Sequence, residues 1–298
     1  ELKMAIADYE EVPKDQVICG NGAAELIYTL TLALKPKNAL VFAPTFAEYE
    51  QALENLGASV SYYKLKKERG FQPGEDFFGC LTPQVDVVFL CNPNNPTGLL
   101  LEKSFLQSVL ELCRKNHTML VVDECFLDFV EEPERHSLKS EISSHSNLFL
   151  LKAFTKRYAM AGIRLGYGLC GNLEFLEQMG KVTQPWNLSV IAQKAGVAAL
   201  KEKDYVRQGR EMVFRELRWM KEEFRKLGIP IYDSQANYLF FEGPKDLWER
   251  CERRGILIRD CSNYTGLTKG YYRVAVKKHE ENQRLLQILR EICGEEKE

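Results

Sequence analysis

A lysine and an arginine stand eight positions apart in a run that could bind an aldehyde and an anion. The run is FTKRYAMAGIRLGY, residues 154–167; Lys156 follows a predicted strand and Arg164 precedes Leu-Gly-Tyr. A lysine amine so placed can form a Schiff base with an aldehyde, while the arginine holds a nearby anion. Pyridoxal 5′-phosphate is an aldehyde that carries its own phosphate, and it would direct the chemistry to the Cα atom of an amino acid.

A glycine-rich turn before a predicted helix offers a second place for the phosphate. The turn is GNGAAE, residues 20–25, in which Gly22 precedes the helix and the N–H groups of Ala23 and Ala24 would face an anion. Thr155, beside Lys156, adds a hydroxyl. Alone, such a turn is more often only a turn, and the sequence lacks the nucleotide-binding patterns GxGxxG and GxxxxGK[ST].

Two polar residues that follow apolar runs could contact an aromatic cofactor ring. Asn95 lies in the loop NPNNPTG, residues 92–98, and its amide could donate to a phenolic oxygen; Asp123 ends the run MLVVD. A carboxylate beside a pyridine nitrogen keeps that nitrogen protonated. Asn95 could instead form an Asx turn and Asp123 could cap a helix, and alone neither is decisive. Their joint occurrence with Lys156 and Arg164, each after a predicted strand, favours a pyridoxal phosphate site.

Composition limits the classes of partner. The chain has 298 residues, 45% of them hydrophobic, and a net charge of −2, so we expect no nucleic-acid partner. Since no apolar stretch approaches the roughly 20 residues of a membrane span, we expect no membrane partner. Nine dispersed cysteines without a C-x-x-C pair indicate a reducing, cytoplasmic location, and four histidines without ligand spacing predict no metal site.

The elements that must position these residues follow an α/β pattern. Apolar runs alternate with helical patterns, which predicts a large, mostly parallel sheet and then a smaller α+β unit. We expect a large cofactor-binding domain over residues 1–200 and a small C-terminal domain over residues 201–298, with a long helix at about 204–227 between them. The strands expected to matter most lie at 17–19, 85–90, 119–122, 148–153, 165–170, 238–241, 256–258 and 272–276.

Taken in order, these motifs resemble the fold-type I pyridoxal-phosphate enzymes of the class I/II aminotransferase superfamily. The resemblance covers essentially the whole chain and implies the pyridoxal-phosphate-dependent transferase fold. It also implies that Lys156 is the Schiff-base lysine, Asp123 the partner of the ring nitrogen and Asn95 the partner of the ring oxygen. The residues expected to hold the cofactor phosphate are Gly22, Ala23, Ala24, Thr155 and Arg164.

The same resemblance assigns the ring face and the substrate. Phe46 would stack on the cofactor ring, with Tyr49 as the less favoured candidate. Arg273, in YYRVAV, matches the arginine that binds the substrate α-carboxylate, and Asn237 and Arg259 are expected to bind substrate as well. Enzymes of this fold usually act as homodimers, which is the state we expect here.

Within the superfamily, two branches that act on phosphorylated substrates are the most similar. The segment ILIRDCSNYTGL, residues 256–267, resembles the threonine-phosphate decarboxylases of cobalamin biosynthesis more than the histidinol-phosphate aminotransferases. The decarboxylase branch implies conversion of L-threonine O-3-phosphate to (R)-1-aminopropan-2-ol O-phosphate. Phe126 favours it, because aminotransferases usually place a tyrosine there.

Two features leave an inactive, cofactor-binding homologue open as a further alternative. Ala153 stands where many relatives carry a serine or threonine for the phosphate. The chain opens with ELKMA, without an initiator methionine or a signal-peptide pattern. The resemblance implies an N-terminal arm that reaches the neighbouring subunit's cofactor phosphate, and we expect that arm to be missing here.

Overall fold

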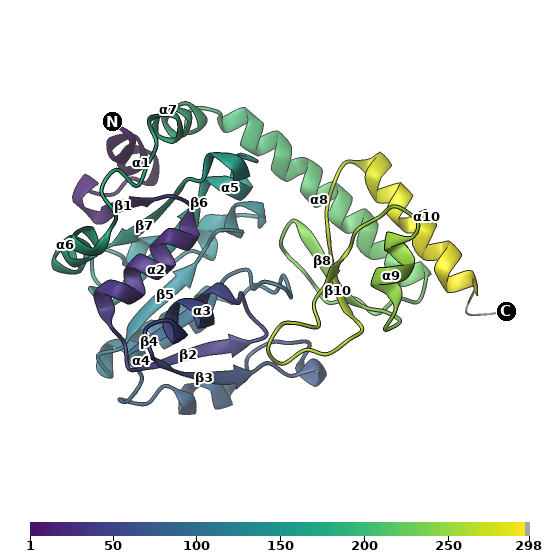
Figure 1. Cartoon of the computed structure of the whole chain (residues 1–298), viewed down its shortest axis with the longest axis horizontal. Coiled ribbons are helices and arrows are strands. Elements are labelled where there is room, and N and C mark those ends of the chain that lie inside the picture. The colour runs from purple at the N-terminus through teal and green to yellow at the C-terminus, as the bar shows by residue number, and fades with distance from the viewer. Residues whose placement is uncertain (296–298) are drawn as a thin grey trace.

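A computed structural model describes residues 1–295 of the chain. It confirms the α/β fold class: a seven-stranded sheet with helices on both faces is joined by one long helix to a smaller unit (Figure 1). The long helix α8 is Lys203–Lys226, close to the expected range. The division of the chain into two domains at residue 200 stays a prediction.

The large sheet is mostly parallel, as its apolar runs predict. Its strand order is β1-β7-β6-β5-β4-β2-β3, and only β7 runs antiparallel to its two neighbours. Parallel strands place their carboxyl ends at one edge, where ligands bind. The strands are β1 Val17–Gly20, β2 Asn38–Ala43, β3 Ser59–Lys64, β4 Val87–Cys91, β5 Met119–Asp123, β6 Leu148–Ala153 and β7 Gly166–Cys170.

Alternating residues of the buried strands pack against two helical layers. In β4, Val87 and Phe89 belong to one apolar core, and Val88 and Leu90 belong to the other. This is the period of two that a strand imposes on its side chains. The first core includes residues of α2 Ala23–Leu34, α3 Glu48–Glu54 and α6 Leu173–Val182, and the second includes residues of α1 Leu2–Glu10, α4 Lys103–Lys115 and α7 Val190–Ala199.

The smaller unit has a three-stranded antiparallel sheet, order β8-β10-β9, covered by helices. A strand expected at 256–258 is wrong: pairing begins only at Arg259, opposite Arg273. Residues 256–258 form a loop instead, in which Ile258 is buried in the small core and Leu257 is 75% exposed. The elements are β8 Tyr238–Glu242, α9 Leu247–Glu252, β9 Arg259–Asp260, β10 Tyr271–Ala275 and α10 His279–Glu295.

Short helices connect the longer elements. Lys156 lies on one of them, α5 Phe154–Arg157, directly after β6. The 3-10 helices are Lys14–Gln16, Lys67–Arg69, Glu75–Cys80, Leu127–Phe129, Pro133–Arg135, Lys139–Glu141 and Ala161–Ile163.

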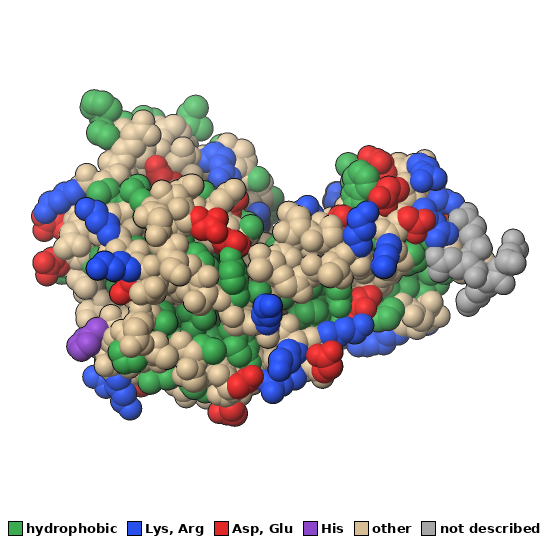
Figure 2. All heavy atoms as spheres, turned by 60° about the horizontal axis from the view of Figure 1, so that its bottom comes forward, with side chains coloured by type: hydrophobic (Ala, Val, Ile, Leu, Met, Phe, Trp, Pro, Cys, Tyr) green, Lys and Arg blue, Asp and Glu red, His purple; other side chains and the backbone are tan. Residues whose placement is uncertain are grey.

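The surface carries mixed charge. On the face shown in Figure 2, lysine and arginine side chains lie among acidic and apolar ones on both lobes. Within residues 1–295, no helix combines the length and the apolar character needed to cross a bilayer. The same residues contain no group of three or more histidine, cysteine or acidic side chains placed to hold a metal ion.

Candidate active site

A cavity of about 350 Å³ lies where β4, β5 and β6 end and the smaller unit faces the large sheet. Chain segments far apart in the sequence contribute to it, from the start of α2 to β10. The predicted site residues that line it are Ala23, Ala24, Phe46, Asn95, Asp123, Thr155, Lys156, Arg164, Arg259 and Arg273.

One end of the cavity is suited to an anion. Gly22 is the N-cap of α2 with φ 81°, and a Cβ atom there would lie 2.7 Å from Nη2 of Arg164. A Cβ atom on Gly166 would lie 2.4 Å from the backbone nitrogen of Ala23. Only glycine allows this close approach. Gly22 itself does not line the cavity. Its lack of a side chain lets Arg164 lie against the start of α2.

The cavity also contains a buried carboxylate that accepts two hydrogen bonds. Oδ1 of Asp123 accepts from the N–H of Cys125 at 2.9 Å, and Oδ2 accepts from the hydroxyl of Tyr49 at 2.6 Å. Burial raises the pKa of Asp123, and the donors on Cys125 and Tyr49 oppose that rise. The sequence suggested Tyr49 only as a less favoured stacking residue; the structure places it behind Phe46, with the two ring centroids 5.6 Å apart.

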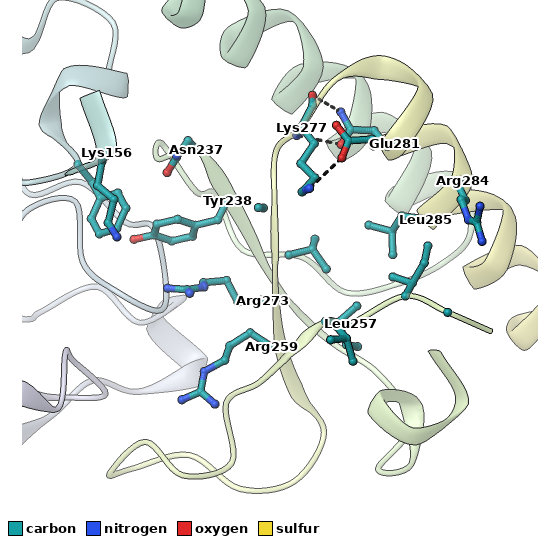
Figure 3. A pocket seen from close by; sticks show the side chains of 17 residues that line it. Lys156, Asn237, Tyr238, Leu257, Arg259, Arg273, Lys277, Glu281, Arg284 and Leu285 are labelled. Carbon is teal, nitrogen blue, oxygen red and sulfur yellow. Dashed lines mark hydrogen bonds and ion pairs between the residues drawn. The ribbon is translucent and has the colours of Figure 1, made fainter. Parts of the chain in front are cut away.

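Lys156 lines the same cavity, beside an aromatic ring. Its Nζ atom lies 5.6 Å from the centroid of the Phe126 ring, and that ring packs edge-on against Tyr238 with centroids 5.1 Å apart. Figure 3 shows the side chains of Lys156, Tyr238 and Arg273 converging from opposite sides of the cleft. An aromatic ring, without a hydroxyl, therefore stands beside the lysine amine.

The smaller unit supplies a cationic wall. Nη1 of Arg273 donates to Oδ1 of Asn95, and the Tyr264 hydroxyl donates to the same oxygen at 3.3 Å. The Arg273 guanidinium also lies 4.8 Å from the centroid of Tyr238. Arg259 donates to the side chain of a neighbouring asparagine at 2.9 Å and lies 5.5 Å from the Tyr264 ring. These contacts connect the smaller unit to the Asn95 loop.

A wider cleft of about 710 Å³ opens beside the cavity and shares Phe126, Lys156, Arg259 and Arg273 with it (Figure 3). Asn237 lies on this wider cleft and not on the inner cavity. Of the predicted substrate residues, Arg259 and Arg273 therefore line both spaces, and Asn237 lines the wider cleft alone. A small molecule in the wider cleft would have access to Lys156.

Two contacting residues were not identified as site residues from the sequence. Tyr264 lies in the segment 256–267 and Tyr238 in the strand expected at 238–241, but nothing local indicates that their rings support Arg259 and Arg273. Their partners are remote in the chain: the Tyr264 hydroxyl and the Asn95 side chain are 169 residues apart. A position at the end of a predicted strand therefore identifies site residues on the large sheet better than it identifies site residues on the smaller unit.

The residues present fit pyridoxal phosphate. The start of α2 with Arg164 and Thr155 offers donors for a phosphate, and Asp123 offers an acceptor for a ring nitrogen. Phe46 and Lys156 line the same cavity, and the lysine supplies the amine needed for an aldehyde. The cavity volume of about 350 Å³ lies within the range of small-molecule sites.

Comparison with known proteins agrees with this chemistry. The family model for aminotransferase class I and II matches residues 1–289. The threonine-phosphate decarboxylase of Salmonella typhimurium is 33% identical over 98% of this chain and 80% of its own length. The histidinol-phosphate aminotransferase of Methanosphaera stadtmanae is 31% identical over 98% of this chain and 80% of its own length.

A solved structure gives the same result for the fold. The histidinol-phosphate aminotransferase from Clostridium acetobutylicum superimposes with a TM-score of 0.92 at 29% identity, over 99% of this chain and 88% of that one. The chain therefore belongs to the aminotransferase class I and II family, and its cofactor is pyridoxal phosphate.

Proposed function

We propose that the chain decarboxylates L-threonine O-3-phosphate, giving carbon dioxide and (R)-1-aminopropan-2-ol O-phosphate. The observation that carries the proposal is the pairing of two cations with the lysine: Arg259 and Arg273 line the same cleft as Lys156. The substrate has two anionic groups, and arginine suits both a carboxylate and a phosphate. The similarity to the Salmonella typhimurium protein supports the same substrate.

Pyridoxal phosphate, when bound, supplies an aldehyde that bonds to amino groups and a protonated ring that accepts an electron pair from Cα. Arg273 would hold the substrate carboxylate by charge-assisted hydrogen bonds. Carbon dioxide would leave from that carboxylate, and Lys156 would donate a proton to Cα in its place. Asp123 would accept a hydrogen bond from the ring nitrogen and so keep that nitrogen protonated.

Product analysis tests the reaction. The protein loaded with pyridoxal phosphate should release carbon dioxide from threonine phosphate, and the Arg273→Gln variant should lose at least about tenfold in kcat/KM because a charge-assisted hydrogen bond is lost. Conversion of histidinol phosphate with 2-oxoglutarate, and no carbon dioxide from threonine phosphate, would overturn the assignment.

A spectrum tests the lysine. Lys156→Ala should abolish the visible absorbance that the protein acquires with pyridoxal phosphate, because no other amine is proposed to bond to the cofactor. Lys181→Ala on α6 is a control that should keep the absorbance, since the side chain of Lys181 is exposed and paired with Glu177. An unchanged spectrum for Lys156→Ala would remove the lysine from its role.

Two alternatives have specific support. Histidinol-phosphate aminotransferase activity is favoured by the relatives of that name at nearly the same identity. A cofactor-binding but inactive protein is favoured by Ala153, which lines the cavity without a hydroxyl for the phosphate. The product assay distinguishes the first alternative from decarboxylation. A visible spectrum of the cofactor without turnover of either substrate would indicate the second alternative.

We also propose a homodimer located in the cytoplasm. Exposed apolar side chains lie close together in the chain around the start of α7: Trp186 is 96% exposed and Ile191 72%. Exposed apolar patches of this kind mark interaction sites. The dispersed cysteines support the location.

A further inference from the structure

Tyr49 is a fully buried polar residue beside the site that has no role in the mechanism above. Tyr49 is 0% exposed, and its hydroxyl donates to Oδ2 of Asp123 at 2.6 Å. Its ring is stacked on Phe89 of β4 with centroids 5.0 Å apart and an interplanar angle of 17°. The edge contact with Phe46 fixes it from a second side. Tyr49 therefore contacts both the residue proposed for the ring nitrogen and the residue proposed for the ring face.

We propose that Tyr49 is a positioning residue that sets the basicity and the direction of the Asp123 carboxylate toward the cofactor ring. The inference rests on the proposed role of Asp123. A buried carboxylate takes up a proton unless donors stabilise its charge, and a protonated Asp123 could not hold a proton on the ring nitrogen. The backbone N–H of Cys125 donates to one oxygen and the Tyr49 hydroxyl to the other, and both hydrogen bonds favour the ionised carboxylate against the effect of burial.

The other titratable groups that face this pair do not replace the Tyr49 hydroxyl. Among the described residues they include the thiols of Cys91 and Cys125, the amine of Lys156, the guanidinium of Arg273 and the hydroxyl of Tyr238, which donates to the carbonyl of Asn94. Burial raises the pKa of both thiols well above the ordinary value, so both stay neutral. Burial likewise raises the pKa of Tyr49, which therefore remains a donor across the working pH range.

Removing the Tyr49 hydroxyl should shift the proton equilibrium between Asp123 and the ring nitrogen in a defined direction. Without it Asp123 becomes a stronger base and draws the proton of the ring nitrogen toward itself. When the ring carries less positive charge, the nitrogen atom that joins Lys156 to the cofactor keeps its proton to a higher pH. We expect Tyr49→Phe to raise the midpoint pH of the visible absorbance change by about one unit, a tenfold change in the proton equilibrium.

The experiment is a pH titration of the visible absorbance of the cofactor-loaded protein, with a melting curve of each variant. Tyr63→Phe is the matched control. Tyr63 lies on the edge strand β3, is also buried, and donates from its hydroxyl to the aspartate Asp76 at 2.7 Å. The control should keep the wild-type midpoint. A Tyr49→Phe midpoint equal to that of Tyr63→Phe would overturn the proposal.

A double-variant cycle separates a local effect from general damage. In an Asp123→Asn background, Tyr49→Phe should change neither the midpoint nor the affinity for pyridoxal phosphate further, because the carboxylate is already gone. The same shift in both backgrounds would overturn the role of Tyr49 while leaving the Lys156 assignment intact. Absence of any visible band in the wild-type protein would overturn the proposed site and the role of Tyr49 together.

Discussion

At the scale of single residues, the ring beside the lysine is the most informative position. Phe126 packs edge-on against Tyr238, and its ring centroid lies 5.6 Å from Nζ of Lys156. A phenylalanine offers no hydrogen bond to a phenolic oxygen of the cofactor. The negative charge on that oxygen therefore depends on the amide of Asn95 alone among the residues we assign to it.

Restoring a hydroxyl at this position should change the cofactor spectrum. In Phe126→Tyr, an O–H donor would stabilise negative charge on the ring oxygen and lower the midpoint pH of the visible absorbance change by about one unit. Titration of absorbance measures it, with Phe129→Tyr, on the adjacent 3-10 helix, as a control that should keep the original midpoint. A midpoint that rises or stays constant would show that the ring oxygen lies out of reach of this side chain.

At the scale of elements, a buried ionic cluster connects α1 to the strands that carry the site. Nζ of Lys152 on β6 lies 3.1 Å from Glu10 of α1 and 3.6 Å from Glu124, which follows Asp123. Burial alone would raise the pKa of Glu10, but Lys152 and the Tyr167 hydroxyl hold it below its ordinary value. The cluster therefore stabilises the fold just behind Lys156.

Breaking this cluster should destabilise the protein in a pH-dependent way. Glu10 contributes stability above its unfolded pKa, and that contribution is lost as the pH falls through its lower folded pKa. Lys152→Met removes the partner and should cost about 3 kcal/mol at pH 8, because two carboxylates are left buried. At pH 5 the cost should be smaller, since those carboxylates can then take up protons.

Denaturant unfolding at the two pH values checks this expectation. A matched control is Lys181→Met on α6, whose 2.8 Å pair with Glu177 is exposed, and which should cost well under 1 kcal/mol. Equal losses for Lys152→Met at both pH values would mean that the cluster does not carry buried charge.

The sequence predicts elements and their ends better than it predicts contacts across the fold. Asp123, Asn95 and Lys156 were identified because residues that follow parallel strands gather at one edge. Tyr49 had no such signal: its hydroxyl reaches a carboxylate 74 residues away, and the helical pattern around it only indicates burial. The strand expected at 256–258 failed because three apolar residues fit a strand and a loop over a small core equally well.

At the scale of the whole molecule, the exposed apolar surface at the start of α7 should mediate self-association. We expect the protein to sediment as a dimer, and Trp186→Ser combined with Ile191→Ser should weaken the dimer at least about tenfold because apolar area no longer leaves water. Sedimentation velocity over a range of concentrations measures the strength of the dimer.

Leu257→Ser, on the smaller unit and 75% exposed, is the control that should leave the dimer unchanged. A wild-type monomer at all concentrations would contradict the expectation.

The contact between the smaller unit and the Asn95 loop has a consequence for how the protein acquires its ligands. The Tyr238 hydroxyl donates to the carbonyl of Asn94 at 2.9 Å, and the N–H of Gln235 donates to the carbonyl of Gly98 at 2.7 Å. The Asn95 loop is thus held by chain synthesised some 140 residues later. During biosynthesis, α2, β7 and Asp123 would be in place before the contacts that fix the Asn95 loop can form. Firm retention of the cofactor would then report that the last part of the chain has folded.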